Sequence, residues 1–277
     1  MLKARIITAI CLLAVFFCAL FLFPPIGWLG FCALVAVLAF WEWGGLMRFR
    51  GPLRWAVSVA AAVVIAVLAA CFPAAFGLGG GSSQAWPLGR WLYFPAAAFW
   101  LAVVPLWLAR RWIAASPLTG ILTGAVVILP AWAALVQLRQ LGALSLLAVM
   151  AIVWLADIAA YFSGRALGRH KLAPAISPGK TWEGAAGGVL AVVAAGLLFA
   201  YGAPGGFSGH PGVLVLLLAA LVAVSIAGDL FESLLKRQAG LKDSGNMLPG
   251  HGGVLDRIDS LTSTLPLVAL LRFGLGV

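Results

Sequence analysis

Long runs of apolar residues alternate with short polar segments along almost the whole chain. A helix needs about 20 mostly apolar residues to cross the bilayer core, where its backbone groups must be hydrogen-bonded internally. Nine runs of about this length predict membrane-spanning helices at residues 6–23, 26–47, 55–77, 91–109, 119–138, 142–163, 184–203, 212–232 and 259–276. Because the runs are continuous rather than alternating, they predict an all-α integral membrane protein and not a membrane β-barrel.

The composition supports this prediction. Hydrophobic residues make up 64% of the 277 residues and charged residues 9%, whereas a soluble domain has about 25% charged residues. The mean hydropathy is +1.09. The first apolar run follows Lys3 and Arg5, and Pro24 and Pro25 lead straight from it into a second run without a small-residue cleavage site. We therefore interpret the first run as a retained helix and not as a signal peptide.

The basic residues are distributed unevenly between the two sides of these spans. With the N-terminus in the cytoplasm, 15 of the 18 Lys and Arg residues fall on the cytoplasmic side, and only Arg90, Arg139 and Arg272 fall outside. The positive-inside rule favours this orientation. The net charge of +10 then belongs to the cytoplasmic surface, where it suits anionic lipid head groups or an anionic substrate rather than nucleic acid.

Carboxylates are rare and gather near the C-terminal end. No Asp or Glu lies between Glu42 and Asp157, and five of the eight lie in the segment 229–259. We therefore divide the chain into an N-terminal part with helices one to five, residues 1–138, and a C-terminal part, residues 139–277, that contains the catalytic site.

Two carboxylates lie within apolar runs outside that segment. Glu42 is close in sequence to Arg48 and Arg50, and we interpret it as a snorkelling or ion-paired side chain. Asp157 shares a helical face with Tyr161 and Arg165. An acid at this depth is costly unless it is paired or faces water. Asp157 is therefore expected to line a polar cavity that opens to the cytoplasm, with a buried ion pair as the alternative.

A basic loop follows Asp157 and ends in Ser177-Pro-Gly-Lys-Thr181. A nucleotide-binding P-loop would need a glycine five positions before Gly179, where this chain has Pro174. No soluble strand precedes the motif either, so we reject the P-loop. Lys180 and Thr181, just before a helix, remain candidates for a phosphate contact. A basic loop on the lipid surface is the alternative interpretation.

The segment 229–259 consists of two helix ends joined by a glycine-rich, basic loop. Asp229 and Ser233 share one helical face, and Asp256 and Asp259 begin the last span. Oxygen ligands without a Cys or His cluster suit a hard cation such as Mg²⁺, which takes one or two carboxylates plus substrate phosphates. We expect Asp229 and Asp256 to hold Mg²⁺, and Asp157, Asp243 and Asp259 are second candidates for binding metal or for holding nearby bases.

Basic side chains surround these acids, which is the mixture that phosphoryl or nucleotidyl transfer uses. The residues expected to bind phosphates are Lys236, Arg237, Lys242 and Arg257. His251 lies between Gly250 and Gly252 and is a candidate to donate to a leaving pyrophosphate or to position a substrate. The glycines would let the backbone approach a phosphate closely.

The motifs of this region resemble a known family. Ser233-x-x-Lys236-Arg237, Lys242-Asp243-x-Gly245 and Pro249-x-His251-Gly-Gly-x-x-Asp256-Arg257-x-Asp259 resemble the signature of the phosphatidate cytidylyltransferases. Upstream, Trp154-x-x-Asp157 and His170-Lys-Leu-Ala-Pro-x-x-Ser-Pro-Gly-Lys-Thr-Trp-x-Gly184 are similar to the bacterial members. The resemblance covers residues 154–263 in detail.

This resemblance implies the reaction of CTP with phosphatidate to give CDP-diacylglycerol and pyrophosphate. It also implies Mg²⁺ dependence, a multi-pass location in the bacterial inner membrane and a site facing the cytoplasm; a second cation and a homodimer remain open. Phosphatidate is already largely ionised near neutral pH, as phosphomonoesters are, so no strong general base is needed. The alternatives are a cation-coupled transporter of an anionic substrate and the same reaction on a different lipid phosphate.

Overall fold

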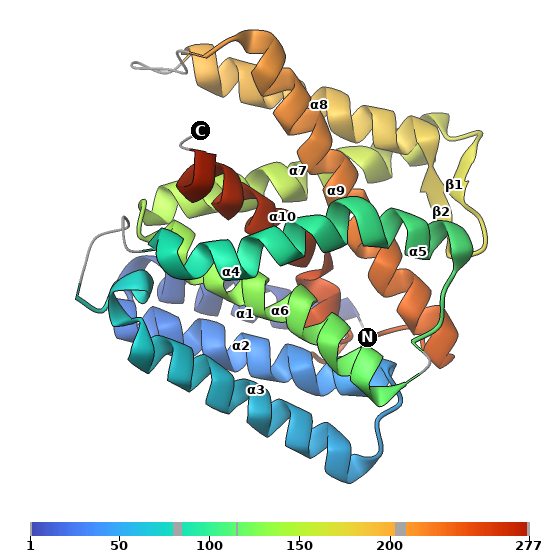
Figure 1. Cartoon of the computed structure of the whole chain (residues 1–277). Helices are drawn as coiled ribbons and strands as arrows, with labels where there is room; N and C mark the ends of the chain where they lie inside the picture. Colours follow the sequence, from blue (N-terminus) through green and yellow to red (C-terminus); the bar gives the residue numbers. More distant parts are fainter. Residues whose placement is uncertain (1, 80–84, 115, 203–208, 276–277) are drawn as a thin grey trace.

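The computed structural model describes residues 2–79, 85–114, 116–202 and 209–275, which form a bundle of helices (Figure 1). Its helices are α1 (Leu2–Leu22), α2 (Pro25–Leu46), α3 (Gly51–Cys71), α4 (Ala85–Ala98), α5 (Val104–Arg110), α6 (Pro117–Arg139), α7 (Ala143–Leu167), α8 (Trp182–Gly202), α9 (Pro211–Ala239) and α10 (Asp259–Ala269). Within the described residues, seven helices are long and apolar enough to cross a membrane, and Ile6–Leu22 is a shorter apolar helix. The predicted all-α membrane fold is confirmed.

Several boundaries differ from the prediction. The fourth span begins at Ala85 rather than 91, because Gly89 and Arg90 interrupt the apolar run without ending the helix. A π-helical turn at Phe99–Val103 joins α4 to α5, just before Pro105, which has no backbone N–H to donate. The eighth span continues to Ala239, so its last turns extend beyond the roughly 20 residues that the bilayer core requires.

The sequence also contains one element that hydropathy did not predict. Strands β1 (Lys171–Ala173) and β2 (Ser177–Thr181) pair antiparallel, with Lys171 opposite Thr181. This hairpin lies between α7 and α8 (Figure 1). Its base is closed by His170, whose Nδ1 lies 2.6 Å from Glu183 Oε1 and whose backbone N–H donates to the same carboxylate.

Helix α10 lies in the middle of the bundle, where it contacts α9, α6 and α4 (Figure 1). Its hydroxyl groups are buried, and among them Ser263 donates to the backbone carbonyl Val224 O and Thr264 to Ser260 O. The helix continues as a π-helical turn over Leu270–Leu275, and residue 276 of the predicted ninth span lies outside the described residues. Because residues from both halves share one core, the proposed division at residue 138 is not a break in packing.

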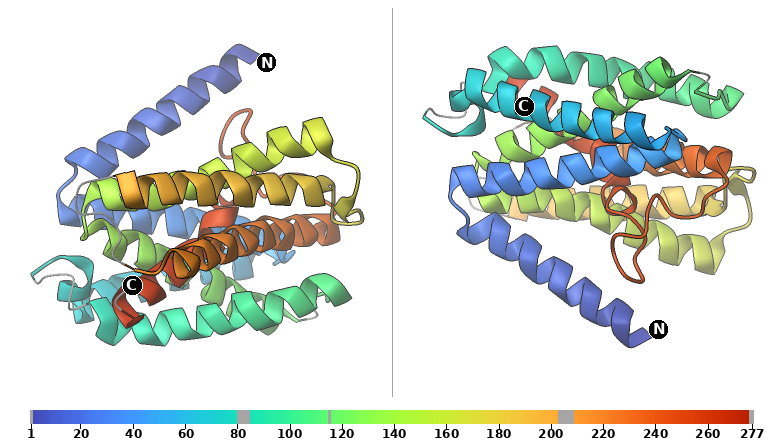
Figure 2. Two further views of the ribbon diagram at one scale, coloured as in Figure 1. Left: turned by 90° about the horizontal axis from the view of Figure 1, so that it is seen from above. Right: turned by 90° about the horizontal axis from the view of Figure 1, so that it is seen from below.

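The connections predicted to be cytoplasmic gather at one end of the bundle. The α2–α3 connection, the β-hairpin and the C-terminal end of α9 lie there, while the α1–α2 and α6–α7 connections lie at the opposite end (Figure 1). Figure 2 shows that α1 points away from the other helices at its N-terminal end. Its other end is held by Arg139, which donates to Leu20 O and Phe23 O.

Candidate active site

Lys180 joins the two polar regions that the sequence analysis identified. It lies on β2, and its Nζ atom is 2.6 Å from Oδ2 of Asp229 on α9. The other carboxylate oxygen of Asp229 accepts a hydrogen bond from Ser233 one turn later. Both Lys180 and Asp229 are partly exposed, with about a quarter of each side chain accessible. The basic hairpin and the acidic helix end therefore meet at one place.

Two further carboxylates lie near this contact. Asp157 on α7 accepts a hydrogen bond from Ser260 Oγ and is close enough to Asp229 and Lys180 to be affected by both charges. Asp259, the first residue of α10, is affected by the charges of Asp229 and Asp157. Three acids from three helices therefore lie near one another, with Lys180 close to Asp157 and Asp229 and Lys236 close to Asp259. Their mutual repulsion favours a bound cation or protonation.

Thr181, the neighbour of Lys180, is almost fully buried. Its hydroxyl oxygen accepts a hydrogen bond from the backbone N–H of Gly184 at 3.1 Å, which is the interaction of an N-capping residue. The side chain also fills the space beside Gly164 and Gly168 on the end of α7. The phosphate contact expected of Thr181 remains a prediction, whereas its role in beginning α8 is evident from the geometry.

A second ionic group lies at the end of α9. Lys236 Nζ is 2.6 Å from Asp256 Oδ1 and 3.1 Å from Glu232 Oε1, and all three side chains are almost buried. Glu232 was not among the predicted site residues, although it shares a helical face with Lys236. Arg237, the next residue, is exposed and remains accessible to a phosphate.

Asp256 organises the segment that precedes it. It lies in a short 3₁₀ turn, η4 (Leu255–Arg257), rather than at the start of α10 as expected. Its Oδ2 atom accepts hydrogen bonds from Ser244 N, Ser244 Oγ and Gly253 N, at 2.8, 3.0 and 2.8 Å. Burial would raise the pKa of Asp256, but the bonds from Lys236 and Gly253 outweigh it and lower that pKa to about 2. Asp256 is thus ionised at any physiological pH.

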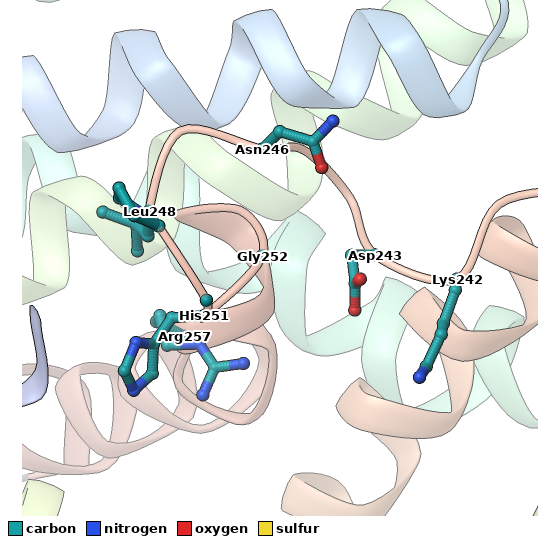
Figure 3. A pocket seen from close by; sticks show the side chains of 9 residues that line it. Lys242, Asp243, Asn246, Leu248, His251, Gly252 and Arg257 are labelled. Carbon is teal, nitrogen blue, oxygen red and sulfur yellow. The ribbon is translucent and has the colours of Figure 1, made fainter. Parts of the chain in front are cut away.

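The residues between α9 and this turn, 240–254, form what we call the α9–η4 loop. It borders a cavity of about 450 Å³, where Lys242 and Asp243 lie on one side and His251 and Arg257 on the other (Figure 3). Lys242, Asp243 and Arg257 are exposed. This cavity brings together four of the residues that were expected to meet the substrates, but Asp157 does not line it, so the polar cavity expected at Asp157 remains a prediction.

One amide of the glycine-rich turn is used within the protein, while the close approach of Gly250 and Gly252 to a phosphate remains a prediction. Gly250 and Gly252 have φ angles of +76° and +77°, a backbone region that residues other than glycine rarely adopt. The N–H of Gly253 donates to Asp256, so this amide is occupied within the protein rather than directed at a phosphate.

Glu42 was interpreted wrongly. It is 1% exposed, so it does not snorkel, and no Lys or Arg lies within ion-pair distance of it among the described residues. Instead its carboxylate accepts hydrogen bonds from Ser244, Val254 and Leu255. Its isolation as the only acid before Asp157 was the signal in the sequence, but the partners could not be seen there because they are more than 200 residues away.

The donor set fits a hard cation. Its ligands would be carboxylate oxygens, which Mg²⁺ prefers. In the described part of the chain, no three Asp, Glu, His or Cys side chains form a ready-made metal centre; this agrees with Mg²⁺ sites in which one or two carboxylates act together with substrate phosphates. At Asp229 a cation would compete with Lys180, and at Asp256 with Lys236.

Comparison with known proteins agrees with the motifs. The profile of the cytidylyltransferase family matches residues 3–274. The chain is 37% identical to a phosphatidate cytidylyltransferase of Haemophilus influenzae, with 99% of both chains covered. It is 43% identical to that of Pseudomonas aeruginosa, covering 100% of this chain and 98% of the relative. With the enzyme of Brucella suis it shares 60% identity over 44% of each chain. The chain thus belongs to the phosphatidate cytidylyltransferase family.

Proposed function

We propose that this site transfers the cytidylyl group of CTP to phosphatidate, giving CDP-diacylglycerol and pyrophosphate. The observation that supports this most directly is the 2.6 Å contact between Lys180 and Asp229. It joins a basic hairpin to the acidic end of α9, and so places cationic and metal-binding chemistry side by side. Nucleotidyl transfer depends on this combination, because positioning and neutralisation of phosphate charge provide most of the catalysis.

In this reaction an oxygen of the phosphatidate phosphate attacks the α-phosphorus of CTP. The bond between the α-phosphorus and the oxygen that bridges to the β-phosphate breaks, and its electron pair leaves with pyrophosphate. The attacking oxygen is already ionised near neutral pH, so no side chain has to remove a proton. The scarcity of candidate bases is therefore no objection to this reaction.

We assign the phosphate groups to the basic residues around the cavity. Lys242 and Arg257 are exposed on its two sides and suit the triphosphate of CTP. His251, on the same side as Arg257, is in place to donate to the leaving pyrophosphate. Arg237 lies in the last turn of α9, and Lys180 lies on β2 just before α8. Both suit the phosphate of the lipid. In this assignment Lys236, which is held between Glu232 and Asp256, orients the two acids.

Asp229 and Asp256 are the proposed ligands of Mg²⁺, with Asp157, Asp243 and Asp259 as further candidates. When bound, the ion would neutralise the negative charge of the phosphates as it redistributes during transfer. These carboxylates would be its protein ligands. Lys180 and Lys236 would offset the negative charge that the ion does not neutralise. We further propose that the enzyme lies in the bacterial inner membrane with this end of the bundle facing the cytoplasm, where CTP is available.

The reaction is tested with the purified protein in detergent, CTP labelled on its α-phosphate and dioleoyl phosphatidate. We expect labelled CDP-diacylglycerol and pyrophosphate in equal amounts, loss of both with EDTA, and recovery with Mg²⁺. A tenfold excess of unlabelled ATP, GTP or UTP should not reduce labelling, whereas CTP should. No labelled lipid from phosphatidate, or equal competition by every nucleotide, would overturn the proposal. Parallel reactions with an ether-linked phosphatidate test the alternative that the enzyme acts on a different lipid phosphate.

A further inference from the structure

Glu42 lies on α2, in the half of the chain that carries none of the family's signature residues, yet it contacts the α9–η4 loop. Its Oε1 accepts a hydrogen bond from Val254 N at 3.0 Å, and its Oε2 accepts from Leu255 N at 2.8 Å and from Ser244 Oγ at 3.1 Å. With 1% of its surface exposed, this carboxylate is almost completely removed from solvent. A buried charge is tolerated only where donors compensate it; here two backbone N–H groups do so, together with the Ser244 hydroxyl, whose single hydrogen is shared with Asp256.

The loop is shaped to fit this carboxylate. A Cβ atom at Gly245 would overlap the carboxylate of Glu42, and one at Gly253 would overlap both Glu42 and Ser244. The two glycines come from opposite ends of the loop. The loop therefore closes around the side chain of Glu42 on α2. Residues from both parts of the loop contact the two oxygens of its carboxylate.

Ser244 connects Glu42 to the active site. Its hydroxyl lies between two carboxylates, 3.1 Å from Glu42 Oε2 and 3.0 Å from Asp256 Oδ2. The backbone N–H of Asp256 in turn donates to Ser244 Oγ. Displacement of Ser244 would therefore displace Asp256, and with it Lys236.

We infer that Glu42 is a positioning residue of the transfer reaction. It binds residues from both parts of the α9–η4 loop, and so keeps Asp256 and the side chains of the cavity in their positions. It touches no substrate. Only an ionised carboxylate can accept on both oxygens, since an amide in its place would present an N–H₂ group to at least one donor. The inference depends on the proposed reaction for its kinetic effect, but the order of the loop can be measured without substrate.

The test compares Glu42→Gln with Trp43→Phe in the full-length protein in detergent. Trp43 is the next residue of α2, is equally buried, and donates to Gly120 O on α6 instead of to the loop. Two properties are measured: kcat and KM for CTP, and the rate of trypsin cleavage after the exposed Lys242, identified by mass spectrometry. For Glu42→Gln we expect kcat/KM to fall about 10- to 100-fold, as when a small misplacement disturbs a reaction geometry, and cleavage after Lys242 to accelerate. Trp43→Phe should retain slow cleavage.

Ser244→Ala provides a second route to the same result, and it remains informative where Glu42→Gln does not fold. It should accelerate cleavage and reduce kcat/KM, and in combination with Glu42→Gln the two effects should be less than additive, because both variants break the same connection. Unchanged cleavage after Lys242 in both variants would overturn the inference, even where wild-type activity confirms the reaction. A fall in activity only in proportion to the loss of folded protein would overturn it as well.

Discussion

Lys180 Nζ lies 2.6 Å from Asp229 Oδ2, although the two residues are 49 positions apart and belong to a surface hairpin and a membrane helix. Asp229 is also near Asp157 and Asp259. Lys180 offsets the charges of Asp229 and Asp157, and the hairpin that carries it is fastened at its base by His170 and Glu183. The position of the Lys180 ammonium group in the site therefore depends on the fold of this short hairpin.

Replacing Lys180 by Gln should remove activity with little change in stability. The pair is partly exposed, and such pairs contribute about 1 kcal/mol or less to folding, whereas a cation that stabilises a transition state is worth about 3 kcal/mol or more. We expect kcat/KM to fall about 100-fold and the melting temperature to shift by only a few degrees. Lys171→Gln, on the opposite strand of the same hairpin, is the matched control and should keep most of the activity. Equal activity of the two variants would contradict the role of Lys180.

The two proposed metal ligands should respond differently to amidation. Asp229→Asn should lose labelled product but remain as stable as the wild type, because its carboxylate is partly exposed. Asp256→Asn should lose both activity and stability, since it leaves Lys236 without its nearest partner in an almost buried site, at a cost of about 3 kcal/mol. Product formation and thermal unfolding in detergent distinguish the two. Wild-type turnover in both variants would exclude the metal assignment.

Acid should weaken the contribution of Asp256 to folding. An Asp side chain in the unfolded chain has a pKa of about 4, whereas hydrogen bonds in the folded state lower the pKa of Asp256 to about 2. Because the folded pKa is the lower one, the contribution is complete above pH 4 or so and disappears as the pH falls towards 2. The difference in stability between wild type and Asp256→Asn should therefore shrink between these pH values, as followed by unfolding midpoints. A difference that is constant over this range would contradict the assigned hydrogen bonds.

The two possible roles of Thr181 can be separated by substitution. Thr181→Val keeps the shape but loses the acceptor for Gly184 N, which should cost about 1 kcal/mol of stability. Thr181→Ser retains the hydroxyl and should retain the cap. If the hydroxyl also contacts a phosphate, Thr181→Val will raise KM for one substrate beyond the effect of lost stability. An unchanged KM in well-folded protein would restrict Thr181 to capping.

The sequence by itself determined the membrane class, the positions of most spans and the family. Apolar runs of the length of a bilayer leave few alternatives to helices, because an unsatisfied backbone group in lipid costs several kcal/mol. For the same reason the few carboxylates of an acid-poor chain could be selected without a structure. Asp229, Asp256 and Lys236 were found in this way, and their motifs gave the family.

Only the tertiary structure decided which of these residues act on each other. Hydropathy does not encode contacts between distant segments, so neither the Lys180–Asp229 pair nor the neighbourhood of Asp157 and Asp259 followed from local spacing. Glu42 is the clearest case. Beside Arg48 and Arg50 in the sequence it resembles a surface ion pair, but in the fold its carboxylate is buried among the amides of a loop more than 200 residues away. A buried charge is defined by the donors that surround it, and those donors come together only when the chain has folded.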